Sequence, residues 1–216
     1  MNANVKIDLW DDYARLFSAI TSRFQQEMYE LAASHLAGSV LDGGCGAAKL
    51  LPYVAASPDV VRYTGVDSSP QMIARARLVL EKFPDVDAQV LLQSIEETRG
   101  RFDSVVSLQS YYSWSDGAAI LEHVRGLVGA GGTFVLASAN ETLDIEKLLD
   151  VASRELLMHP DWDDFARINR ALAGTGTGNF VSLDTLIREA RAARFGVREA
   201  HTELYAGGLN FLVLAT

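Results

Sequence analysis

The sequence predicts an α/β fold built around a mostly parallel sheet. Short apolar runs alternate five times with helical patterns, an order that covers both faces of a parallel sheet with helices. At the end of the chain, two further apolar runs (197–204 and 209–215) flank Tyr-Ala-Gly-Gly, which is a hairpin signal. We therefore expect seven strands, of which the last two form an antiparallel hairpin.

Composition and charge restrict the class of protein. The chain has 216 residues, 49% of them hydrophobic and 22% charged, which suits one domain with a full core. The net charge of −9 argues against nucleic acid or an anionic membrane as the main partner. Four scattered histidines and a single cysteine, Cys45, exclude a disulfide framework and a metal cluster.

The start of the chain lacks the pattern of a signal peptide, and no apolar run has the length needed to span a bilayer. We therefore expect a cytoplasmic protein, monomeric or homodimeric, that acts on a small molecule without a nucleic-acid or membrane partner.

Two helices are predicted before the first strand, over residues 9–20 and 22–36, because apolar residues recur there at i, i+3 and i+4. Two interpretations of their aromatic residues stay open. The rings either pack on the domain edge or form a lid over a ligand, with Trp10, Tyr13 and Phe17 lining it. We expect residues 1–37 to be an N-terminal helical lid on an α/β domain of residues 38–216.

The alternating segments follow in order. Strands are expected at 40–42, 60–66, 86–92, 102–108 and 133–137, with helices at 49–56, from Ser69 onwards and at 118–128. After the fifth strand the alternation stops, and two helical patterns, 141–158 and 161–172, lead into a Gly-rich stretch, 174–179. This break predicts a helical cap inserted at about residues 141–180, with a flexible return to the helix that begins at Ser182.

The stretch 38–51, Gly-Ser-Val-Leu-Asp-Gly-Gly-Cys-Gly-Ala-Ala-Lys-Leu-Leu, is the clearest functional signal. A strand ends in an acid, three glycines follow, and a helical pattern begins. Glycines allow positive φ and close approach of a ligand, and a helix N-terminus near Ala48 would offer free N–H groups. This arrangement predicts a nucleotide-type ligand. A nicotinamide site would need a third glycine, where this chain has Lys49.

Several motifs together resemble the class I S-adenosylmethionine-dependent methyltransferases. They are Val40-Leu-Asp-Gly-Gly-Cys-Gly46, Gly65-Val-Asp-Ser-Ser69, Phe102-Asp-Ser-Val-Val-Ser107 and Leu127-Val-Gly-Ala-Gly-Gly132, and the hairpin completes the family pattern. The resemblance extends from about residue 36 to residue 216. It implies a Rossmann-like fold, S-adenosyl-L-methionine as cofactor and methyl transfer to a small metabolite.

The resemblance also assigns cofactor contacts. Asp67, about twenty residues after the loop, would accept the ribose hydroxyls, Asp42 would help hold the ammonium group, and Met72 would cover the adenine. The family's Gly-Asp-Ala after strand three is replaced by Ser94-Ile95-Glu96, so adenine contacts are expected from the Ile95 backbone and from Ser94 or Glu96. The full expected set is Asp42, Gly44, Gly46, Asp67, Ser68, Met72, Ser94, Ile95, Gln109, Trp10 and Tyr13.

Tyr111, Tyr112 and Trp114 follow the fourth strand, at the edge expected to face the sulfonium. Aromatic faces attract cations, so these rings form a candidate cation-binding wall; the alternative is that they pack beneath the cap. The candidate catalytic residues are Tyr112, Asn140 and His159, and no metal site is expected.

The sequence contains no obvious general base, which leaves two alternatives to methyl transfer. One is intramolecular cyclisation of S-adenosylmethionine to azetidine-2-carboxylate with release of methylthioadenosine, since the chain resembles azetidine-2-carboxylate synthases in size and aromatic content. The other is a non-catalytic protein that binds S-adenosylmethionine.

Overall fold

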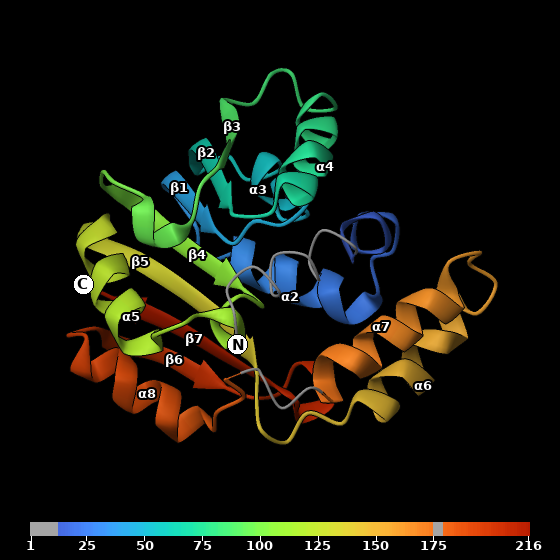
Figure 1. The fold of residues 1–216 in the computed structure, drawn as a ribbon. Helices are drawn as coiled ribbons and strands as arrows, with labels where there is room; N and C mark the ends of the chain where they lie inside the picture. Colours follow the sequence, from blue (N-terminus) through green and yellow to red (C-terminus); the bar gives the residue numbers. More distant parts are fainter. Residues whose placement is uncertain (1–12, 175–178) are drawn as a thin grey trace.

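The computed structural model describes residues 13–174 and 179–216, which form one seven-stranded sheet with helices on both faces (Figure 1). The strand order is β3-β2-β1-β4-β5-β7-β6. The pairings among β1 to β5 are parallel, whereas β7 lies antiparallel between β5 and β6. The predicted Rossmann-like fold with its closing antiparallel hairpin is thereby confirmed.

The strands are β1 (Gly38–Gly43), β2 (Val60–Asp67), β3 (Ala88–Leu92), β4 (Phe102–Leu108), β5 (Val128–Ala139), β6 (Gly196–His201) and β7 (Leu209–Ala215). The α-helices with stated bounds are α2 (Arg23–Ala33), α3 (Leu51–Ala55), α4 (Pro70–Leu80), α5 (Gly117–Leu127), α6 (Ile145–Leu156), α7 (Trp162–Gly174) and α8 (Leu183–Ala192). Residues 13–19 are also helical. Three 3₁₀ turns are η1 (Ile95–Glu97), η2 (Tyr111–Ser113) and η3 (Tyr205–Gly207).

Local sequence explains where several helices begin. Ser22 caps α2 in a capping box with Gln25, and Ser69 caps α4 just before Pro70. Asp116 and Ser182 cap α5 and α8 in the same way. Each cap satisfies a backbone N–H of the first turn that has no partner inside the helix.

Several element boundaries differ from the sequence prediction. The first crossover helix, expected over residues 49–56, is shorter: α3 begins at Leu51, after a turn in which Ala48 has a left-handed φ of 54°. The fifth strand is longer than expected, because β5 begins at Val128, directly after α5, and pairs there with Phe102.

Two apolar clusters hold the helices to the sheet. On one face, α2, α3 and α4 contribute side chains such as Met28, Leu51 and Ile73. On the other face, α5 and α8 contribute Leu121 and Leu186. A third cluster joins residues 13–20 to α6 and α7, which lie side by side and apart from the helices that cover the sheet (Figure 1).

None of the described helices is long and apolar enough to cross a membrane. Within the same residues, no group of three or more His, Cys, Asp or Glu side chains is placed to hold a metal ion.

The core contains one buried carboxyl group. Asp42 of β1 is 3% exposed and accepts a hydrogen bond of 2.7 Å from the hydroxyl of Tyr63 on β2. Burial raises the pKa of the Asp42 carboxyl to about 7; the hydrogen bond from Tyr63 opposes this rise, and the charge of Asp67 adds to it. Ionisation of the Asp42 carboxyl therefore lowers the stability of the folded protein.

This carboxyl predicts a specific pH dependence of stability. Between about pH 4 and pH 7 the folded state holds a proton on Asp42 that the unfolded chain has lost, so the free energy of unfolding falls as pH rises through this window. Asp42→Asn should remove that fall and so gain stability relative to wild type, on the order of a few kcal/mol at pH 8 compared with pH 4. Denaturant titrations at both pH values measure the difference.

Asp59→Asn is the matched control, because Asp59 is an exposed carboxylate at the opposite end of β2. It should keep the pH dependence of the wild type. If Asp42→Asn shows the same pH slope as the wild-type protein, Asp42 is not the titrating group.

Candidate functional site

A cavity of about 880 Å³ lies at the carboxyl ends of the parallel strands. Its wall on the sheet side includes Gly44 after β1, Asp67 at the end of β2, Ile95 after β3 and Gln109 after β4. The opposite wall comes from residues 13–17, α2, α6 and α7. In open parallel sheets, ligands bind at this edge.

The glycine loop after β1 is tightly enclosed. A side-chain Cβ at Gly44 would lie 2.6 Å from the Cβ of Ser110, and one at Gly46 would lie 3.0 Å from the ring of Phe17. Both glycines have positive φ, 76° and 53°, which other residues adopt only with strain. Glycine at these positions therefore lets the loop pass between the turn after β4 and the helical segment 13–19.

Hydrogen bonds to β2 hold the loop in place. The N–H groups of Gly44 and Cys45 donate to the carbonyl of Val66 at 2.9 and 3.0 Å. The N–H of Gly46 donates to Oδ2 of Asp67 at 2.9 Å. The expected helix N-terminus near Ala48 is wrong, because turns continue to Leu50 before α3 begins.

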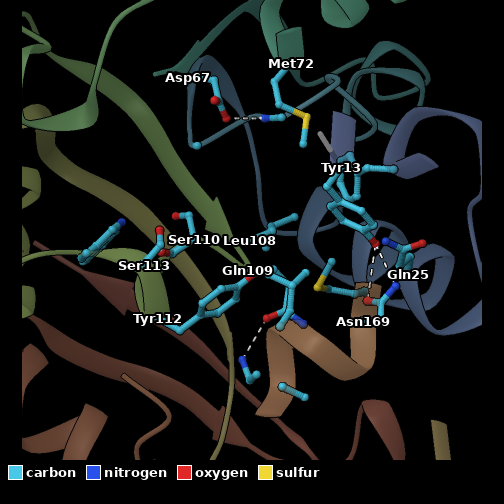
Figure 2. Close-up of a pocket in the computed structure, with 18 of the residues that line it drawn as sticks. Tyr13, Gln25, Asp67, Met72, Leu108, Gln109, Ser110, Tyr112, Ser113 and Asn169 are labelled. Atoms are coloured by element: carbon cyan, nitrogen blue, oxygen red, sulfur yellow. Dashed lines mark hydrogen bonds between the residues drawn. The ribbon is translucent and has the colours of Figure 1, made fainter. Parts of the chain in front are cut away.

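Asp67 lines the cavity and also organises its edge. Its Oδ1 accepts a hydrogen bond from the N–H of Ser69 at 2.9 Å, while Oδ2 accepts the bond from Gly46. Ser68 and Met72 line the cavity next to it, and Figure 2 shows Asp67 and Met72 on the same side. The carboxylate therefore joins the glycine loop to the start of α4.

The segment after β3 provides the next part of the wall. Ser94 and Ile95 line the cavity, as do their neighbours Gln93 and Glu96. Ile95 is 6% exposed, and its Cδ1 would lie 2.4 Å from a Cβ at Gly43. The side chain of Ile95 thus packs on the glycine loop.

Gln109 follows β4 with a φ of 58°, a left-handed conformation that glycine adopts more easily. Its N–H donates to the carbonyl of Ala137 at 2.7 Å, and its Oε1 accepts from the N–H of Ala139 at 2.8 Å. Strained backbone of this kind is frequent at functional sites. The Gln109 side chain lines the cavity while it ties the end of β5 to the turn after β4.

The three aromatic residues after β4 separate into two environments. Tyr112 and Trp114 line the cavity. Tyr111 is 2% exposed and packs in the core, where its hydroxyl donates to Glu189 of α8. The prediction of a three-residue aromatic wall is therefore wrong for Tyr111, because α5 and α8 cover it.

Two predicted catalytic residues do not line the cavity. Asn140 is 3% exposed; its Nδ2 donates to the carbonyl of Gly207 at 3.0 Å, and its Oδ1 accepts from the N–H and hydroxyl of Thr142. His159 lies in the turn between α6 and α7, where its Nδ1 accepts from the N–H of Asp161. Both side chains hold loops together and are absent from the described cavity wall.

Of the other residues predicted to bind the cofactor, one lines the cavity, one lies outside the described residues and one lies in the core. Tyr13 is 4% exposed and lines the cavity, and Trp10 lies outside the described residues. Asp42 lies behind the glycine loop in the core and is not part of the cavity wall.

Lys49 takes the place of the missing third glycine, and the structure gives this residue a bridging position. Its Nζ donates to the carbonyl of Ile20 and lies 4.0 Å from the centroid of the Phe17 ring. Burial lowers the pKa of the Lys49 ammonium group to about 7. Lys49 therefore connects the glycine loop to the helical segment 13–19.

Sequence reasoning missed much of the wall opposite the sheet. This wall includes Gln25 and Tyr29 of α2, Phe165 and Asn169 of α7, and Tyr205 of η3. Figure 2 shows Tyr13, Gln25 and Asn169 close together on one side of the cavity. The helical periodicity of these segments indicated apolar faces but not which end of the sheet those faces would meet.

Several solved structures share this fold. A mycolic acid cyclopropane synthase, CmaA1, solved with S-adenosylhomocysteine, is 17% identical with a TM-score of 0.70, over 97% of this chain and 95% of that one. The magnesium protoporphyrin IX methyltransferase from Synechocystis PCC 6803 is 18% identical with a TM-score of 0.65, over 89% and 83% of the two chains. The N-methyltransferase NodS from Bradyrhizobium japonicum WM9 is 16% identical with a TM-score of 0.61, over 90% and 88%.

The comparison with family models gives the assignment. A search of curated proteins gave no match. Residues 9–200, which are most of the chain, match the model of a methyltransferase domain. The protein therefore belongs to the methyltransferase-domain family, in agreement with the class I S-adenosylmethionine-dependent methyltransferases that its motifs resemble.

Proposed function

We propose that the protein binds S-adenosyl-L-methionine at the carboxyl edge of the sheet and transfers its methyl group to a small molecule in the half of the cavity beneath α6 and α7. The observation that carries this proposal is one continuous cavity, which runs from Asp67 on the sheet to Asn169 on α7. Its volume of about 880 Å³ is near the upper end of the roughly 300–1,000 Å³ typical of ligand sites. A cavity of this size suits a cofactor together with a second molecule.

The residues present fit the cofactor. Among the described residues of the cavity wall, the charged side chains are Asp67 and Glu96, so the wall favours a cationic ligand. The aromatic rings of Tyr112 and Trp114 add an attractive surface for positive charge. When bound, S-adenosylmethionine supplies a methyl group activated by its sulfonium centre.

Each part of the wall would then have a distinct role. Asp67 would accept hydrogen bonds from ribose hydroxyls, and its existing bonds to Gly46 and Ser69 hold the carboxylate in position. Met72 and Ile95 would contact the adenine as apolar surfaces, and Ser68, Ser94, Gln109 and Tyr13 would complete the contacts. Asp42 would act indirectly, because it lies behind the loop.

We also propose that residues 13–20 act together with α6 and α7 as a lid. Tyr13, Leu16 and Ile20 pack against Leu149, Trp162 and Phe165 in one apolar cluster, whereas α2 packs on the sheet. The lid would thus combine part of the expected N-terminal segment, residues 1–37, with the expected insertion at about 141–180. Closure of such a lid excludes water from the reacting groups.

The solved neighbours support a small-molecule acceptor. They include a methyltransferase for magnesium protoporphyrin IX and an N-methyltransferase, NodS, both solved with S-adenosylhomocysteine. Cyclisation of S-adenosylmethionine itself is a second candidate function, which the aromatic surface of Tyr13, Tyr112 and Trp114 also favours.

One incubation separates these reactions. Purified protein is mixed with S-adenosylmethionine alone, and the products are identified by mass spectrometry. Methyl transfer predicts that the cofactor stays intact until an acceptor is added, and that S-adenosylhomocysteine then forms. Methylthioadenosine formed without an acceptor would contradict methyl transfer and support cyclisation. If the cofactor stays intact and no acceptor in a broad screen yields S-adenosylhomocysteine, the result contradicts methyl transfer and supports a non-catalytic binding protein.

Asp67→Ala should weaken S-adenosylhomocysteine binding by at least about tenfold, because hydrogen bonds to a charged group contribute roughly 1.5–3 kcal/mol each. Isothermal titration calorimetry measures the dissociation constant. Asp59→Ala removes the same charge at the opposite end of β2 and should leave binding unchanged. Equal affinities of Asp67→Ala and wild type would exclude Asp67 from the site.

A further inference from the structure

The charged side chains of α6 and α7, the two helices of the cap, lie on the surface away from the cavity. Every charged side chain of α6 and α7 is exposed. Several of these charges pair on the outer surface, where Arg170 bonds Glu146 at 2.7 and 3.0 Å and Arg154 bonds Asp150 at 3.1 Å. The inner faces of both helices therefore meet the cavity with uncharged residues.

The inner surface is largely apolar. On α6, Leu148, Leu149 and Ala152 line the cavity and are at most 8% exposed. On α7, Phe165 and Leu172 line it. A surface of this kind binds apolar groups by removing them from water.

Three neutral hydrogen-bonding side chains, those of Tyr13, Gln25 and Asn169, lie together beside this apolar surface. Asn169 Nδ2 donates to the hydroxyl of Tyr13 at 3.0 Å and to the carbonyl of Phe165 at 2.8 Å. Gln25 lies beside them (Figure 2), and its Oε1 accepts from the N–H of Ser22 in the cap of α2. Burial raises the pKa of the Tyr13 hydroxyl, so this group stays uncharged at neutral pH.

The two charged residues of the described wall lie at its other end. Asp67 follows β2, and Glu96 lies in η1 after β3, both on the sheet side. An anionic group placed beneath α6 and α7 would meet no positive charge from the described wall. Burial of an unpaired anion is strongly unfavourable.

From this separation we propose that the half of the cavity beneath α6 and α7 selects an uncharged, largely apolar acceptor whose single polar end meets Tyr13, Gln25 and Asn169. The inference rests on the proposed function, since it names the class of molecule that would occupy the space next to the cofactor. It makes Tyr13, Gln25 and Asn169 determinants of specificity and the outer charges of α6 and α7 irrelevant to binding.

Binding of two probes that share a naphthalene ring but differ in charge tests this inference. Protein saturated with S-adenosylhomocysteine is titrated by calorimetry with neutral 1-naphthol and with anionic 1-naphthoate at pH 7. The neutral probe should bind at least about tenfold more tightly, because the carboxylate loses hydration without gaining a charged partner. Equal or tighter binding of naphthoate, or no binding of naphthol, would overturn the proposal.

Two variants of α6 locate the bound probe. Ala152→Phe fills the inner face and should weaken naphthol binding at least about tenfold while the affinity for S-adenosylhomocysteine stays within about twofold of wild type. Lys147→Phe puts the same ring on the exposed face of α6 and should change neither affinity. If Ala152→Phe binds naphthol as tightly as wild type, the probe lies elsewhere and the inference is wrong.

Failure of the proposed function gives a different result. A protein that does not bind S-adenosylhomocysteine would contradict the function itself. A protein that binds S-adenosylhomocysteine but prefers naphthoate would contradict only the inferred class of acceptor.

Discussion

Two hydrogen bonds that the Asp67 carboxylate accepts join the segments that form the sheet side of the candidate site. One comes from Gly46 in the loop after β1, and the other comes from Ser69 at the start of α4. Because β1 and β2 are parallel neighbours, the ends of both strands reach the same edge, and one side chain can join the segments that follow them. The N–H groups of Gly44 and Cys45 donate to the carbonyl of Val66, and the N–H of Gly46 donates to Asp67, so the end of β2 holds the glycine loop in place.

The proposed lid contacts that loop. Lys49, at the end of the loop, reaches the carbonyl of Ile20 and the ring of Phe17, and Phe17 packs against Gly46. Residues 13–20 then pack on α6 and α7 through the third apolar cluster. Contacts thus continue from the carboxyl end of β2, through the glycine loop and residues 13–20, to α6 and α7.

Much of the fold could be predicted from periodicity and turn residues. The alternation of strands and helices and the hairpin around Tyr-Ala-Gly-Gly predicted seven strands, mostly parallel, with a closing antiparallel hairpin, and the structure has this sheet. The start of α3 could not be predicted, since the left-handed backbone at Ala48 belongs to a residue that usually favours helix. Turns over residues 46–50 precede α3, and the loop before them is held by bonds to Val66 and Asp67 that no local pattern indicates.

The sheet side of the candidate site was also predictable, and the cap side was not. Gly44, Gly46, Asp67, Met72 and Ile95 all come from segments that directly follow strands, so topology brings them together. Asn140 and His159 follow β5 and α6 as closely, yet their side chains satisfy nearby backbone groups. Asn169 and Tyr205 reach the cavity through packing between segments distant in sequence, for which no local pattern exists.

A crystal structure of the protein with S-adenosylhomocysteine tests the account most directly. The account predicts the ribose on Asp67, the adenine between Met72 and Ile95, and the sulfur directed toward Tyr112 and the space beneath α6 and α7. A ligand bound at another edge of the sheet, or a ribose that does not contact Asp67, would contradict it.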